Sequence, residues 1–225
     1  MPKASTDTAR ELARLSTDCS FLLTHMVRQN GEPQKTDDEA KRALQSILRL
    51  SPVGGPILKG GKVGWYGAVG ANSFDPVTST FNSAPACRAV CFTESTLTGL
   101  RAHRQVFGVK YGVAFDRDWL FGRGANPCLN IRQDILKADL SPLPGENFNR
   151  KVYHYIPPWL HPFVNVINDS FDATHEREWR QPDDLTFTST DLRFVFCPER
   201  EFGTFSGLQN VGLPTLFDLD WLDRV

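Results

Sequence analysis

Short segments with the pattern of β-strands are spread along the whole chain, and few helical patterns separate them. Residues 20–28 (SFLLTHMVR) alternate so that Leu23, His25 and Val27 share one face of a strand. Further strands are predicted at residues 86–92, 111–115, 128–131, 171–180 and 192–197. Strands from scattered parts of a chain with few helices between them predict an α+β fold with a partly antiparallel sheet.

The helical signals are caps followed by apolar residues at helical spacing. Thr36-x-x-Glu39 is a capping box ahead of an apolar stripe, and Pro52 sets the limit of this helix. Other predicted helical segments are a short helix opened by Thr8-x-x-Glu11, a helix near residues 95–107, a turn capped by Asp116, and a last turn at residues 216–222. Prolines across residues 141–162 restrict any helix there to short or broken pieces.

No break in composition marks a domain boundary, so a single domain over residues 1–225 is expected. Its most irregular part is the glycine-rich stretch 51–75, which carries Trp65 and Tyr66 and is predicted to be a long loop with at most short strands. Loops of this length in a compact domain are usually functional or mobile.

Charge and apolar content exclude several classes of protein. Lys and Arg number 25 and Asp and Glu 26, so no global basic field attracts nucleic acid. No stretch approaches the roughly 18 apolar residues of a membrane-spanning helix, and the first residues lack a secretory signal. Five cysteines, an odd number, fit reduced thiols, so a cytoplasmic protein without membrane contact is expected.

Two familiar catalytic motifs fail, and a metal-binding pattern is weak. Gly60-Gly61-Lys62 lacks the Ser or Thr of a phosphate loop, and no G-x-S-x-G marks a serine hydrolase. Cys87-x-x-x-Cys91 with His103 is a weak metal pattern, and two cysteines packed as small apolar residues explain it better.

The most unusual segment is residues 174–180 (THEREWR). On a strand, Glu176 and Glu178 share a face while Arg177 and Trp179 share the other. Neighbouring carboxylates repel, which suits a site where a ligand or cation uses them. An exposed edge strand, with Arg177 or Arg180 as partners of the glutamates, is the alternative explanation.

Two further positions have both a functional and a structural interpretation. His25 has apolar strand neighbours, so it points into a cleft or is a satisfied core histidine. Thr93, in the segment Cys91–Ser95, lies where a strand ends before a helix; it is a site residue or simply the cap of that helix.

Taken in order, these segments resemble a known group. They are L-x-H-x-x-R at residues 23–28, L-x-x-I-L at 44–48, the glycine-rich loop, V-C-F-T-E at 90–94, Y-G-V-A-F at 111–115 and E-x-E-W-R at 176–180. The set resembles bacterial abortive-infection and phage-defence proteins of the AbiGi type. More distantly it is similar to the ADP-ribosyltransferase superfamily that includes the DarT toxins.

The resemblance implies a split, partly antiparallel sheet core with peripheral helices and a cleft that binds NAD. It makes His25 the ribose anchor, Thr93 the second-strand residue, Glu178 the catalytic carboxylate and Glu176 the residue that orients the acceptor. Thr24, Arg28, Phe92 and Tyr111 are expected beside the cofactor. Phe-Thr-Glu at residues 92–94 departs from the Tyr or Ser-Thr-Ser of the superfamily.

The function implied is an NAD-dependent ADP-ribosyltransferase, a toxin-like defence effector that modifies nucleic acid or protein and has a cognate antitoxin or defence partner. Two alternatives stay open. A non-enzymatic antitoxin-like or accessory protein would use Trp65, Tyr66 and the 51–75 loop for binding. A divalent-metal nuclease would use a cluster of carboxylates, formed by Asp172, Glu176, Glu178, Asp183 and Asp184.

Overall fold

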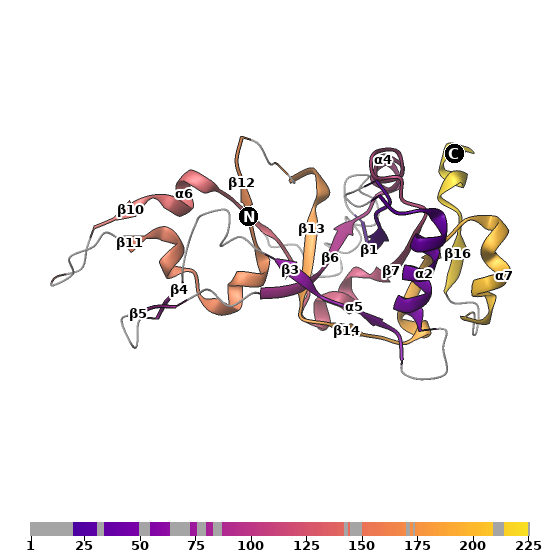
Figure 1. Ribbon diagram of the computed structural model, residues 1–225, viewed down its shortest axis with the longest axis horizontal. Coiled ribbons are helices and arrows are strands. Elements are labelled where there is room, and N and C mark those ends of the chain that lie inside the picture. Colours follow the sequence, from indigo (N-terminus) through magenta and orange to yellow (C-terminus); the bar gives the residue numbers. More distant parts are fainter. Residues whose placement is uncertain are drawn as a thin grey trace, which may run out of the picture. The chain divides into compact units, whose positions relative to one another are not determined.

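A computed structural model describes residues 20–30, 34–49, 55–63, 73–75, 80–82, 87–141, 144, 150–169, 172, 174–208 and 214–224 (Figure 1). The chain divides into two compact units. Unit 1 contains residues 1–59, 92–125 and 185–225, and unit 2 contains residues 60–91 and 126–184. Composition does not change at these boundaries, so the amino-acid sequence carries no sign of the division.

Unit 1 is built on a mostly antiparallel sheet. Its strand order is β16 (Thr215–Phe217), β15 (Leu192–Phe196), β7 (Tyr111–Asp116), β1 (Leu22–Val27) and the last residues of β6 (Cys87–Glu94). Only the pair of β15 and β16 is parallel among these. The predicted strands at 20–28, 86–92, 111–115 and 192–197 are therefore confirmed.

Two helices of unit 1 begin at the caps that the sequence predicts, and a third begins at a different residue. In α2 (Asp37–Leu48) the Thr36 hydroxyl accepts from the Glu39 N–H at 3.3 Å, and Glu39 accepts from the Thr36 N–H at 2.8 Å. Asp116 caps α5 (Arg117–Gly122) as predicted. Thr96 caps α4 (Leu97–Phe107), so the interpretation of Thr93 as the cap of this helix is wrong; Thr93 lies within strand β6. The helical turn predicted at 216–222 is partly wrong, because β16 occupies its start and a 3-10 segment, η7 (Leu219–Arg224), follows.

Both faces of the central strands of unit 1 are covered. On one face Leu100 of α4 and Leu219 of η7 pack with Ala114 and Phe196. On the other face Trp119 of α5 stacks on Phe115 at 5.4 Å. Burial on both faces explains why residues 111–115 are apolar almost throughout and alternate only weakly.

The remaining elements of unit 1 are short. They are the paired strands β2 (Ile57–Leu58) and β14 (Leu185–Thr186), the 3-10 segments η4 (Ser189–Asp191), η5 (Glu199–Glu201) and η6 (Ser206–Leu208), and the helix α7 (Phe202–Phe205).

In unit 2 the first residues of β6 pair with β3 (Gly61–Val63) and β13 (Glu178–Pro182), and β13 pairs with β8 (Asn126–Pro127). Beside this set, β9 (Leu129–Arg132) runs parallel to β12 (Val164–Ile167). Leu136, Val164 and Val166 form a small core there. The predicted strand at 128–131 is confirmed.

The other elements of unit 2 are also short. They are the strand pairs β4 (Ser73–Asp75) with β5 (Thr80–Asn82) and β10 (Asp139–Leu140) with β11 (Arg150–Lys151), the helix α6 (Gln133–Lys137), and the 3-10 segments η1 (Val152–Tyr155), η2 (Pro158–Phe163) and η3 (Thr174–Glu176). In the described part of residues 141–162, the helical segments are short 3-10 turns, as predicted, and β11 is a two-residue strand.

Several predictions fall on residues that the structure does not describe. Thr8, Glu11, Cys19, Trp65 and Tyr66 all lie outside the described residues, as does much of the 51–75 stretch. The described pieces of that stretch contain the short strands β2, β3 and β4. None of the helices in the described part of the chain has the length and apolar character needed to cross a membrane.

Candidate functional site

The strand predicted over residues 171–180 is wrong in its first half. Thr174–Glu176 forms one 3-10 turn, Arg177 has a positive φ of 45°, and the strand begins only at Glu178. Glu176 and Glu178 therefore do not share a face of a strand. The two carboxylates that define the predicted motif belong to different local structures, because the left-handed residue between them breaks the alternation.

Glu178 instead shares a strand face with Arg180. The guanidinium Nε lies 2.9 Å from Glu178 Oε1 and its Nη2 lies 3.1 Å from Oε2, so the pair is bidentate. The two side chains are about equally buried, 10% and 9% exposed. The rule that residues i and i+2 of a strand share a face, which led to the prediction for Glu176 and Glu178, therefore holds for Glu178 and Arg180.

Arg180 is also anchored on its other side. Its Nη1 donates to the carbonyl oxygens of Pro162 at 3.1 Å and Val164 at 2.9 Å. These carbonyls belong to the end of η2 and the start of β12. The pair therefore fixes the Glu178 carboxylate relative to a neighbouring segment of unit 2.

Two thiols flank this ion pair. Although part of Cys91 is exposed, atoms packed around its sulfur withhold water, and the nearby Glu178 carboxylate adds repulsion; together they raise the pKa of the thiol to about 12. The pKa of Cys128 is also raised, mainly by burial, and its N–H donates to the Glu178 carbonyl at 2.8 Å. Near neutral pH both thiols are therefore almost entirely protonated, which is the slowly reacting form.

Unit 1 holds the other residues that the sequence pointed to. The His25 ring meets Phe92 edge to face at 6.0 Å, and Phe92 is itself a core residue. Thr24 is 1% exposed, and its hydroxyl bonds the Ser95 hydroxyl and the Thr93 carbonyl. The contacts of Thr24 and Phe92 therefore link strand β1 to strand β6. The side chains of His25 and Thr93 are half-buried.

The two remaining predicted residues have structural partners. Arg28 is exposed and its guanidinium lies over the Phe107 ring, 4.5 Å from the centroid. Tyr111 is fully buried and donates from its hydroxyl to Glu201 at 3.1 Å; burial is the main reason that its pKa is raised.

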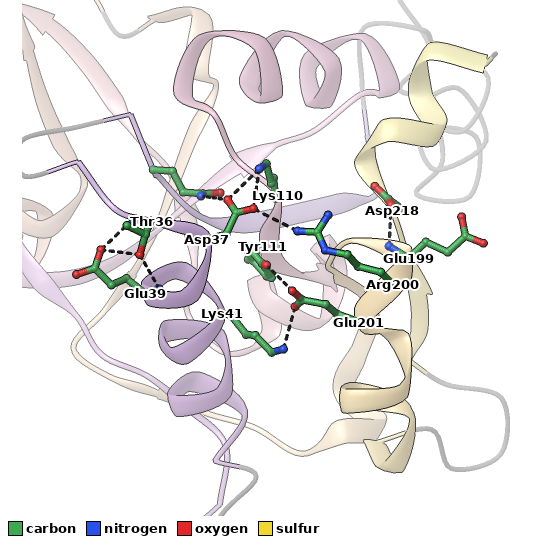
Figure 2. A network of polar contacts seen from close by, with 11 residues as sticks. Thr36, Asp37, Glu39, Lys41, Lys110, Tyr111, Glu199, Arg200, Glu201 and Asp218 are labelled. Atoms are coloured by element: carbon green, nitrogen blue, oxygen red, sulfur yellow. Dashed lines mark hydrogen bonds and ion pairs between the residues drawn. The ribbon is translucent and has the colours of Figure 1, made fainter.

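Tyr111 belongs to a polar network that the sequence did not reveal (Figure 2). Lys110 donates to both oxygens of Asp37 at 2.8 and 2.9 Å, and Arg200 lies 3.3 Å from the same carboxylate. The hydrogen bonds from Lys110 and Gln29 hold the pKa of Asp37 below its usual range. The residues of this polar network come from segments far apart in sequence, so no local sequence pattern connects them.

Three of the five carboxylates proposed for a metal nuclease each bond to a different neighbour. Glu178 pairs with Arg180, Asp184 pairs with Arg88 at 3.0 Å, and Asp172 accepts from the Thr174 hydroxyl at 2.7 Å. Among the described residues, no group of three or more His, Cys, Asp or Glu side chains is placed to hold a metal ion.

Comparison with known proteins identifies no relative: no family model, no curated protein and no solved structure matches the chain. Function must therefore be inferred from the side chains themselves. Of these, the Glu178 carboxylate is held through both of its oxygens by Arg180 in a largely buried place.

Proposed function

We propose that this protein is an NAD-dependent ADP-ribosyltransferase and that Glu178 is its catalytic carboxylate. The observation that carries the proposal is the bidentate hold of Arg180 on Glu178, at 2.9 and 3.1 Å, in a largely buried setting. A fixed carboxylate with little water around it is the group that stabilises a developing positive charge most effectively.

The reaction creates such a charge. The bond between the ribose C1′ and the nicotinamide nitrogen breaks, and its electron pair leaves with nicotinamide. The ribose carbon becomes cation-like, as in glycoside cleavage. An oxygen or nitrogen of the acceptor then bonds to C1′ and loses its proton to solvent or to a nearby base.

Other residues receive their roles from the family resemblance. His25 is proposed to hold the ribose on the nicotinamide side of NAD and Thr93 to act as the second-strand residue; both side chains are half-buried in unit 1. Glu176 is proposed to orient the acceptor, and it does so from a 3-10 turn rather than from the strand. Two buried neighbours support the unit 1 residues: the Phe92 ring contacts His25, and the Thr24 hydroxyl donates to the Thr93 carbonyl.

The direct test is the release of nicotinamide from labelled NAD by the purified protein in cell lysate. We expect Glu178→Gln to lower the rate by about a hundredfold or more, because it removes the charge without changing the shape. Label that passes to nucleic acid or to protein in the same assay names the acceptor class.

Asp134→Asn is a matched control. Asp134 forms the same side-on bidentate pair with an arginine two residues away, at 3.0 and 2.9 Å from Arg132, but both side chains are well exposed. We expect this variant to retain the wild-type rate within about twofold. Equal rates for wild type and Glu178→Gln would show that Glu178 is not the catalytic group.

A further inference from the structure

We infer that Arg180 is a positioning residue, which holds the Glu178 carboxylate in the orientation needed for reaction. The inference rests on the proposed function. It assigns a role to a residue that the family resemblance left without one.

The geometry leaves the guanidinium little freedom. The Nε and Nη2 atoms of Arg180 donate to the two oxygens of the Glu178 carboxylate. Its Nη1 donates to the carbonyl oxygens of Pro162 and Val164. Rotating the side chain would break hydrogen bonds at both ends in a largely buried place. Arg180 therefore transmits the position of residues 162–164 to the carboxylate of Glu178.

The ion pair leaves part of the hydrogen-bonding capacity of the Glu178 carboxylate unused. Each carboxylate oxygen has two lone pairs, and the bidentate pair uses one on each oxygen. The remaining lone pairs can accept from a ribose hydroxyl or face a positive ribose carbon. Arginine can thus fix Glu178 without blocking it.

Lysine cannot replace this arrangement. An ammonium group is a point charge on a flexible stem, whereas the planar guanidinium matches both carboxylate oxygens and the two carbonyls together. Arg180→Lys keeps the charge and removes the fixed orientation. This variant therefore separates positioning from simple charge balance.

The first measurement is kcat and KM for NAD in wild type, Arg180→Lys and Arg132→Lys, with a thermal melt of each. We expect Arg180→Lys to lower kcat by about 10- to 100-fold while KM changes by less than about threefold, since misplacing a catalytic group affects mainly the chemical step. Arg132→Lys disrupts the matched exposed pair and should leave both constants unchanged.

The second measurement follows the carboxylate without using NAD. Glu178 raises the pKa of Cys91 and Arg180 lowers it, so the alkylation rate of Cys91 by iodoacetamide reports the position of Glu178. Mass spectrometry of the Cys91 peptide gives this rate. We expect faster alkylation in Glu178→Gln, by about tenfold, because this variant removes the charge that raises the Cys91 pKa.

The possible outcomes separate the two proposals. If wild type releases no nicotinamide, the proposed function fails and the role of Arg180 fails with it. If wild type is active but Arg180→Lys keeps its kcat, only the positioning role is overturned. A fall in kcat that the melt attributes to unfolded protein also overturns it.

Discussion

Gly60 lies where a single added carbon would meet the backbone. Its N–H donates to Asp184 at 2.9 Å, and a Cβ at this position would lie 2.3 Å from the carbonyl oxygen of Asp183. We expect Gly60→Ala to reduce the free energy of unfolding by about 1–3 kcal/mol or more, measured by urea denaturation. Gly61→Ala is the control, since its added methyl group would have no atom within 4 Å; equal losses in the two variants would contradict this explanation.

His161 predicts a dependence of stability on pH. It is buried, with Nε2 lying 2.8 Å from the Ile156 carbonyl, and burial lowers its pKa from 6.5. His161 therefore binds a proton less readily in the folded protein than in the unfolded chain, which stabilises the folded state when the imidazole is neutral. The contribution of His161 to the free energy of unfolding is complete above about pH 6.5. It is lost as the pH falls towards the lower pKa that His161 has in the folded protein.

The measurement is the urea midpoint of unfolding at a series of pH values from 7 to 5. We expect wild type to lose stability over this range and His161→Gln to lose less, whatever the stability of the variant at pH 7. His154, whose pKa is also lowered, contributes in the same direction and remains in both proteins. Parallel pH profiles would show that His161 does not titrate in this way.

At this scale the sequence predicted which segment is unusual but misjudged its geometry. Period-two spacing joined Glu176 to Glu178, although the pair that forms is Glu178 with Arg180. The cause is the positive φ at Arg177, a conformation that arginine rarely adopts. The neighbouring residues give no sequence signal that predicts it. The partners Pro162 and Val164 are carbonyl groups, which no sequence motif identifies.

Among the elements, α2 offers the cleanest test because its capping box is reciprocal. Thr36→Ala removes the side-chain acceptor for the Glu39 N–H, 3.3 Å away, and we expect a loss of about 1 kcal/mol in the free energy of unfolding. Thr36→Ser retains the hydroxyl and should lose little. Thermal or urea unfolding distinguishes the two, and similar losses would argue against the cap as the cause.

Helix starts were predictable since caps are local, and long central strands were predictable since their apolar residues are buried. Thr36 and Asp116 both cap the helices that the sequence assigned to them. The short strands were harder: β16 has three residues and depends on pairing with β15, a contact remote in sequence. Tertiary pairing overrides local preference in such segments.

For the whole molecule, the proposed function predicts an effect on the cell that makes it. We expect induced expression of wild type in bacteria to arrest growth and Glu178→Gln to permit it, because the toxin-like action that the family resemblance implies would depend on NAD chemistry. Asp134→Asn should arrest growth like wild type. Growth curves at matched expression levels test this, and equal arrest by Glu178→Gln would assign any toxicity to another cause.

The division into two units also has a consequence for how the gene can change. The chain passes between the units at residues 59/60, 91/92, 125/126 and 184/185, and the second passage falls inside strand β6. No single continuous stretch of gene encodes either unit. An exchange of residues 60–184 with another gene would carry α4, β7 and α5 of unit 1 along with unit 2. The two units are therefore inherited together, and neither is available as a module for recombination.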